Sequence, residues 1–163
     1  MIDANPDKAP GYLMLAHVLA DQGENDAALE QVAQALKDPD PSVQADILAL
    51  RGWIYLNMER RDEARADFDA VLKDDNAPYH RAALLGRGAL ALAEERFTDA
   101  REPIEQGIGQ DSRYGLGHLL LAQLEQAQGR PGRALAELQT ARNLILYPGE
   151  RAALEAFAKD LHP

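Results

Sequence analysis

Small residues recur at fixed intervals along this chain of 163 residues, in four pairs whose members lie 12 positions apart. Successive pairs begin 36, 36 and 34 residues after one another. The pairs are Ala16 with Ala28, Gly52 with Ala64, Gly88 with Ala100, and Ala122 with Ala134. A fixed period of this length is typical of proteins built from stacked supersecondary units. The sequence therefore predicts four consecutive repeats.

Each repeat also places a bulky apolar residue 16 positions after its first small residue, and these residues are Val32, Phe68, Ile104 and Leu138. Two helix backbones approach closely only where no large side chain separates them, and larger residues fill the space on either side. The spacing thus predicts a pair of antiparallel helices in each repeat. A tight turn would join the two helices, as the glycine-containing segments 21–25 and 128–132 indicate.

The helix pairs are expected at residues 9–21 with 25–37, 42–58 with 61–74, 78–94 with 97–110, and 113–127 with 131–145. An all-helical reading agrees with a composition dominated by alanine, leucine, glutamate, glutamine and arginine, and with the absence of any segment that alternates like a strand. Prolines stand near the expected helix boundaries, apart from Pro103. Because Pro103 lies inside the second helix of repeat three, that helix is expected to be kinked and the least stable.

This pattern resembles the tetratricopeptide repeat family, and repeat two matches the family signature best, at Leu48, Gly52, Tyr55, Ala64, Phe68 and Leu72. The resemblance covers nearly the whole chain. It implies an all-α fold, a right-handed solenoid of antiparallel helix pairs. We expect one domain over residues 1–163, with repeats at about 9–41, 45–78, 81–112 and 115–148, and a capping helix at about 149–161.

Both ends of the chain carry further expectations. Pro6 stands ten residues before Ala16, as Pro78 stands ten before Gly88, so residues 1–8 are expected to end a preceding repeat of a longer array. At the other end Leu154, Phe157 and Leu161 share one helical face and are expected to cover the last repeat.

Composition argues against several function classes. The chain has no cysteine and no transmembrane run, its first residues lack the basic and apolar regions typical of a signal peptide, and its formal charge is −10. Without a basic stripe we expect no nucleic-acid partner. The four histidines lie in separate repeats, and Gly86-Arg87-Gly88 follows no strand, so no metal, cofactor or phosphate site is expected. No residue grouping indicates catalysis, and we expect neither an enzyme nor direct membrane insertion.

The resemblance implies that the first helices of the repeats line a concave groove that binds a protein or peptide. The side chains expected to face the groove are Leu13, Met14, His17, Leu50, Trp53, Leu56, Asn57, Leu85, Leu92, Leu119, Leu120 and Gln123. Most of these are apolar, which favours an amphipathic helix or an extended peptide with apolar anchors. The lysines and arginines of arrays that grip a C-terminal carboxylate are missing at the matching positions. The alternative is that the groove residues pack against one another, or against a neighbouring unit of the parent protein.

Three residues of the first helices invite specific hypotheses. Trp53, the only tryptophan, is expected to be the main anchor of a partner. Arg51 is expected to form a salt bridge with Asp67 on the facing helix. At the equivalent place Arg87 would meet Pro103, which leaves open whether Arg87 forms a pair between repeats or contacts a ligand.

Three functional classes fit these observations. The first is a scaffold segment of a larger bacterial protein, and the second is a self-contained chaperone of the type III secretion kind. The third is a module that associates with a second copy of itself. An acidic N-terminal half, with 16 acidic and 7 basic residues in positions 1–75, would attract a basic partner, or would simply keep the helices solvated. The sequence does not distinguish a cytoplasmic from a periplasmic location in a bacterium.

Overall fold

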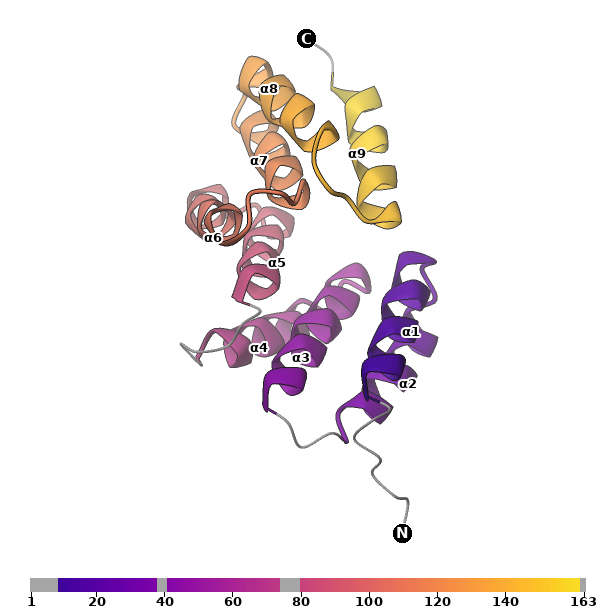
Figure 1. Cartoon of the computed structure of the whole chain (residues 1–163). Helices are drawn as coiled ribbons and strands as arrows, with labels where there is room; N and C mark the ends of the chain where they lie inside the picture. The colour runs from indigo at the N-terminus through magenta and orange to yellow at the C-terminus, as the bar shows by residue number, and fades with distance from the viewer. Residues whose placement is uncertain (1–8, 38–40, 74–79, 162–163) are drawn as a thin grey trace. The chain divides into compact units, whose positions relative to one another are not determined.

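The computed structural model describes residues 9–37, 41–73 and 80–161. Within these ranges all regular structure is helical, apart from one bridge between Tyr114 and Ile145, and the predicted all-α class is confirmed (Figure 1). The helices are α1 (Ala9–Asp21), α2 (Asn25–Ala35), α3 (Pro41–Asn57), α4 (Arg61–Leu72), α5 (His80–Ala93), α6 (Phe97–Gln110), α7 (Leu116–Ala127), α8 (Pro131–Arg142) and α9 (Pro148–Asp160). The expected tail of a preceding repeat, at residues 1–8, lies outside the described residues.

Four helix pairs are each closed by a turn of three residues, at 22–24, 58–60, 94–96 and 128–130. The middle residue of every turn has a positive φ, and these residues are Gly23, Glu59, Glu95 and Gly129. In each turn the last residue donates its N–H to a carbonyl one turn back in the first helix, as Arg60 does to Tyr55 at 2.8 Å. This pattern satisfies the orphan carbonyls at the end of a helix. The same turn therefore recurs in all four of the described helix pairs, with glutamate replacing glycine in the middle two.

The small residues lie where the paired helices approach most closely. Ala16 and Ala28 have no exposed surface, and they pack with Val32 between α1 and α2. A Cβ atom added to Gly52 would lie 2.5 Å from the Phe68 ring, too close for any real contact. The 12-residue spacing thus marks the close approach of two helices, and the 16-residue spacing marks the bulky residue that fills the space beside it.

The chain divides into two compact units, Met1–Ala83 and Leu84–Pro163, here called the N-terminal and C-terminal units. In the N-terminal unit one apolar cluster joins α1, α2 and α3, and a second surrounds Phe68 of α4. In the C-terminal unit α7 pairs with α8 and also packs against α6. The expected repeat boundaries and the single domain stay predictions.

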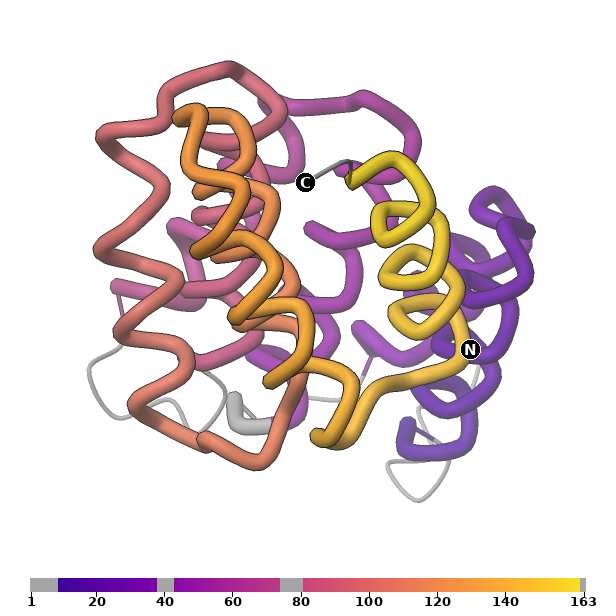
Figure 2. The backbone as a smooth tube through the Cα atoms, turned by 90° about the horizontal axis from the view of Figure 1, so that it is seen from above, coloured from indigo at the N-terminus to yellow at the C-terminus, as the bar shows by residue number. Residues whose placement is uncertain are grey.

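The last helix, α9, packs against α7 and α8 (Figure 2). Leu154 is 1% exposed in a cluster with Leu119 and Leu138, and Phe157 and Leu161 pack against the same cluster. The apolar face expected at the C-terminal end of the sequence is thus the face that α9 buries.

Two helix boundaries differ from the prediction by three residues, and the others by two at most. α7 begins at Leu116 instead of 113, and α8 ends at Arg142 instead of 145. The reason is a short backbone bridge, in which Ile145 donates its N–H to the carbonyl of Arg113 at 2.9 Å and accepts from Gly115 at 2.8 Å. Because these groups pair with one another, neither segment continues its helix.

Pro103 lies inside α6, which runs without interruption from Phe97 to Gln110. Proline has no N–H to offer the carbonyl four residues earlier, so one hydrogen bond of the helix is missing. The lower stability expected for α6 stays a prediction.

Candidate binding surface

All twelve predicted groove residues lie on the first helices of the pairs, α1, α3, α5 and α7. Eight of them keep solvent exposure. Met14, His17 and Asn57 are exposed, and Leu13, Trp53, Leu56, Leu92 and Gln123 are half-buried. The other four are buried, and they are Leu50, Leu85, Leu119 and Leu120.

The four buried leucines stabilise the stacking of helices. Leu50 packs with Val32 and Ile54 where α3 meets α2. Leu119 of α7 packs with Leu138 of α8 and with Leu154 of α9. A partner would therefore meet mainly the other eight side chains, and their role in binding stays a prediction.

Trp53 is held in a fixed orientation within the N-terminal unit. Its indole Nε1 donates a hydrogen bond to the carbonyl of Ala82 at 3.0 Å. The ring also meets Phe68 edge to face, with ring centroids 6.0 Å apart and an interplanar angle of 69°. A half-buried indole with its only donor already paired offers a partner apolar surface and no free hydrogen-bond donor.

The predicted pair between Arg51 and Asp67 is confirmed. Arg51 Nε and Nη2 each donate to one carboxylate oxygen at 2.7 Å. Asp67 is only 5% exposed, so this bidentate pair balances a buried charge between α3 and α4. The hydrogen bonds to Asp67 raise the pKa of Arg51, against the effect of burial. Arg51 is thus a structural residue, and the two roles considered for Arg87 stay predictions.

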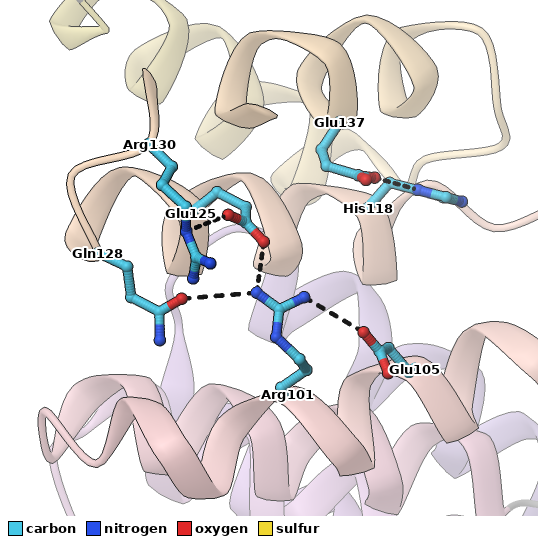
Figure 3. Close-up of polar contacts among 7 residues, drawn as sticks. All are labelled: Arg101, Glu105, His118, Glu125, Gln128, Arg130 and Glu137. Atoms are coloured by element: carbon cyan, nitrogen blue, oxygen red, sulfur yellow. Dashed lines mark hydrogen bonds and ion pairs between the residues drawn. The ribbon is translucent and has the colours of Figure 1, made fainter. Parts of the chain in front are cut away.

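A second buried carboxylate joins α6, α7 and the turn after α7, and sequence reasoning missed it (Figure 3). Glu125 is 4% exposed and forms an ion pair with Arg101 of α6. Its other oxygen lies 2.7 Å from Arg130 Nε, in an ion pair without hydrogen-bond geometry. Arg101 also donates to Gln128 at 3.5 Å and to Glu105 at 3.2 Å. The cluster links two consecutive repeats.

A signal for Glu125 was present in the sequence. In the other three repeats the equivalent position carries an apolar or aromatic residue, namely Leu19, Tyr55 and Ala91. An acid in a column of apolar residues is expected to be buried and paired. Its arginine partners could not be chosen from sequence, because the chain has 13 arginines.

A third polar pair lies between the helices of the last pair. His118 Nδ1 of α7 is 2.7 Å from Glu137 of α8 (Figure 3). Both residues are half-buried. Within the ranges that the structure describes, no three histidine, cysteine or acidic side chains gather as metal ligands would, and no helix is long and apolar enough to cross a bilayer.

An open depression of about 700 Å³ lies beside the backbone bridge of the C-terminal unit. Arg113 on its rim is tied to Asp111 by two side-chain hydrogen bonds, at 3.0 and 2.9 Å. Those bonds raise the pKa of Arg113, and they leave its guanidinium hydrogen-bonded to Asp111. The lining residues are Ser112, Arg113, Asn143, Leu144, Ile145, Leu146 and Arg151.

Comparison with known proteins gives a family match and several similar folds. A sequence profile described as tetratricopeptide repeat matches residues 13–57 and 49–114. Among curated protein sequences, none gives a significant match.

The type IV pilus biogenesis factor PilW superposes with a TM-score of 0.69 at 23% identity, over 90% of this chain and 67% of PilW. Yeast Tom70 gives 0.67 at 20% identity, over 96% of this chain and 33% of Tom70. A tetratricopeptide repeat protein from Parabacteroides merdae gives 0.64 at 20%, over 91% of this chain and 58% of that protein. At these identities the likeness concerns the fold alone.

Proposed function

The chain belongs to the tetratricopeptide repeat family, a family of protein-interaction scaffolds, and on this premise we propose that it binds an apolar or amphipathic peptide segment on the exposed sides of its first helices. In the N-terminal unit the binding side chains are Leu13, Trp53 and Leu56, together with the exposed Met14. In the C-terminal unit Leu92 and Gln123 take the same role.

The observation that carries this proposal is the fixed but half-exposed indole of Trp53. Aromatic side chains in rigid settings dominate many protein interfaces. Because the Ala82 carbonyl and the Phe68 ring already hold the indole, little side-chain freedom is lost when a partner covers it. The pairing of its N–H within the chain favours an apolar contact over a polar one.

The test uses Trp53 as its own reporter, since the chain has one tryptophan. We would titrate the protein with a synthetic helical peptide that carries leucines on one face and lysines on the other. Binding on the first helices should shift the tryptophan emission. Leu56→Ala should weaken binding about fivefold or more, which corresponds to about 1 kcal/mol.

A matched control is Leu135→Ala, which removes an exposed leucine from α8, a second helix. It should leave the affinity unchanged. An unchanged tryptophan spectrum at saturation, or equal losses for the two variants, would refute the proposed site. Circular dichroism on both variants would verify that each remains folded.

A further inference from the structure

The open depression of the C-terminal unit combines positive charge with apolar surface. Its two charged lining residues are Arg113 and Arg151, and none of the described residues that line it is acidic. Its volume of about 700 Å³ falls within the range of about 300–1,000 Å³ that is typical of sites for drug-sized ligands. A depression of this size can take a few residues of a partner chain.

The depression is formed by loops between repeats. Residues 112–113 precede α7, and residues 143–146 join α8 to α9. Only Arg151 is contributed by a helix, in the first turns of α9. The lining residues therefore lie outside the helix faces on which one repeat packs against the next.

The two arginines are not equally available to a partner. Arg113 donates from Nε and Nη2 to the two carboxylate oxygens of Asp111, so its charge is already balanced. The Arg151 side chain is exposed and has no hydrogen bond or ion pair with any described residue. Its neighbour Glu150 does not line the depression, and the Glu150 carboxylate accepts the N–H of Tyr147 at 2.8 Å. The depression thus presents one unpaired guanidinium with its N–H donors unused.

The apolar part of the depression is accessible as well. Ile145 is 51% exposed, and Leu144 and Leu146 beside it are half-buried. Tyr147, the next residue, is 50% exposed, and its ring lies 6.2 Å from the ring of Tyr114. Exposed apolar side chains that gather in one place mark interaction sites.

The backbone of the depression is held in place by hydrogen bonds. Ile145 donates to the carbonyl of Arg113 at 2.9 Å and accepts from Gly115 at 2.8 Å. The side-chain amide of Asn143 donates to the carbonyl of Gln139 at 3.0 Å. A partner would meet a surface that is ordered before binding, which lowers the entropic cost of association.

We propose that this depression binds a short segment of a partner protein in which one acidic residue stands next to an isoleucine or leucine. The carboxylate of the partner accepts two hydrogen bonds from the guanidinium of Arg151, and the apolar side chain covers Ile145. Charge selects this class of segment, because a basic segment would be repelled by the unpaired arginine. A nucleic acid would bring many phosphates to a site with one unpaired cation.

The probe is a peptide with blocked ends, in which a single glutamate stands between an isoleucine and a leucine and is flanked by glycines. Blocked ends leave this glutamate as the only carboxylate. Titration into the whole ¹⁵N-labelled chain should give saturable shifts of the backbone amides of residues 113–115 and 143–147 in nuclear magnetic resonance spectra. A glutamine in place of the peptide's glutamate should weaken binding by at least about fivefold.

The decisive variant of the protein is Arg151→Gln, which should weaken binding by at least about fivefold without loss of helical circular dichroism. Arg133→Gln is the matched control, because Arg133 is exposed on α8 of the same unit and does not line the depression. Both variants change the net charge equally, and the control should bind as the unmodified chain does. Ile145→Ser, which leaves the backbone bridge in place, should also weaken binding.

Any of four results would overturn the proposal. Two concern the peptide, namely no saturable shift of the two loops at millimolar concentration, or equal affinity for the glutamine peptide. The third is equal affinity of the Arg151→Gln and Arg133→Gln variants. The fourth is a dimer in sedimentation equilibrium that Arg151→Gln dissociates, because the occupant would then be a second copy of the chain. The helical peptide that tests the Trp53 surface is basic, so its result does not bear on this site.

Discussion

The substitution Gly52→Ala tests the close approach of α3 and α4 with the smallest possible change. The added methyl would lie 2.5, 2.8 and 3.0 Å from three atoms of the Phe68 ring. Phe68 has no exposed surface, so its ring cannot swing into solvent. Overpacking a core costs about 1–3 kcal/mol, and this site belongs at the upper end. Alanine stabilises a helix by about 1 kcal/mol relative to glycine, which offsets part of this cost. The free energy of unfolding should therefore fall by about 2 kcal/mol.

The measurement is urea unfolding followed by far-ultraviolet circular dichroism and by Trp53 fluorescence. Since Trp53 contacts Phe68, its emission reports on the N-terminal unit. A loss of about 2 kcal/mol should lower the thermal midpoint by about 4–8 °C in a chain of this size. Gly132→Ala is the control, because nothing lies within 4 Å of its Cβ position in α8. That variant should be more stable by about 0.5–1 kcal/mol.

A second substitution separates the steric cause from other effects of alanine. Repeat one pairs Ala16 with Val32 at the equivalent positions, so Phe68→Val should relieve the clash of Gly52→Ala. The double variant should be at least about 1 kcal/mol more stable than the sum of the single effects predicts. Additive effects, or equal stability of Gly52→Ala and Gly132→Ala, would refute the interpretation of the small positions.

Three further predictions concern polar side chains. Arg51→Met should lower the free energy of unfolding by about 2–4 kcal/mol in urea titrations, because it leaves the buried Asp67 carboxylate unpaired. Adding Asp67→Asn to this variant should recover part of the lost stability. Glu125→Gln should cost only about 1–2 kcal/mol by the same measurement, because Arg101 and Arg130 are partly exposed and water can solvate them. Burial lowers the pKa of His17 from 6.5, so the unfolded chain binds more protons just below that pH. Stability should therefore fall on acidification from pH 7.5 to 5, and it should fall less in His17→Gln, which lacks the titrating ring; an identical pH dependence of the two proteins would contradict this.

The outcome for the candidate surface shows where sequence reasoning stops. A helical repeat fixes which residues share a face, so all twelve predicted side chains do lie on first helices. The repeat does not determine how much of the surface of each helix is buried by neighbouring helices. Leu119 and Leu120 are neighbours on α7 and both are buried, because α7 is contacted by α6, α8 and α9.

The two buried carboxylates illustrate the same limit. Asp67 could be paired with Arg51 from the repeat register, since both lie within one helix pair. Glu125 takes its partners from α6 and from the turn after α7. Pairing between repeats depends on how one helix pair stacks on the next, which no spacing within a repeat specifies.

The sequence by itself determined the helix pairs, their register and the contacts at the small positions. These follow from local spacing, because 12- and 16-residue intervals place side chains at the crossing of two neighbouring helices. The tertiary structure decided which apolar side chains remain exposed, since exposure depends on the helices that pack from outside each pair. Leu15 and Leu121 occupy the same place in the repeat, yet Leu121 is buried on α7, which packs against α6, whereas Leu15 stays accessible on α1.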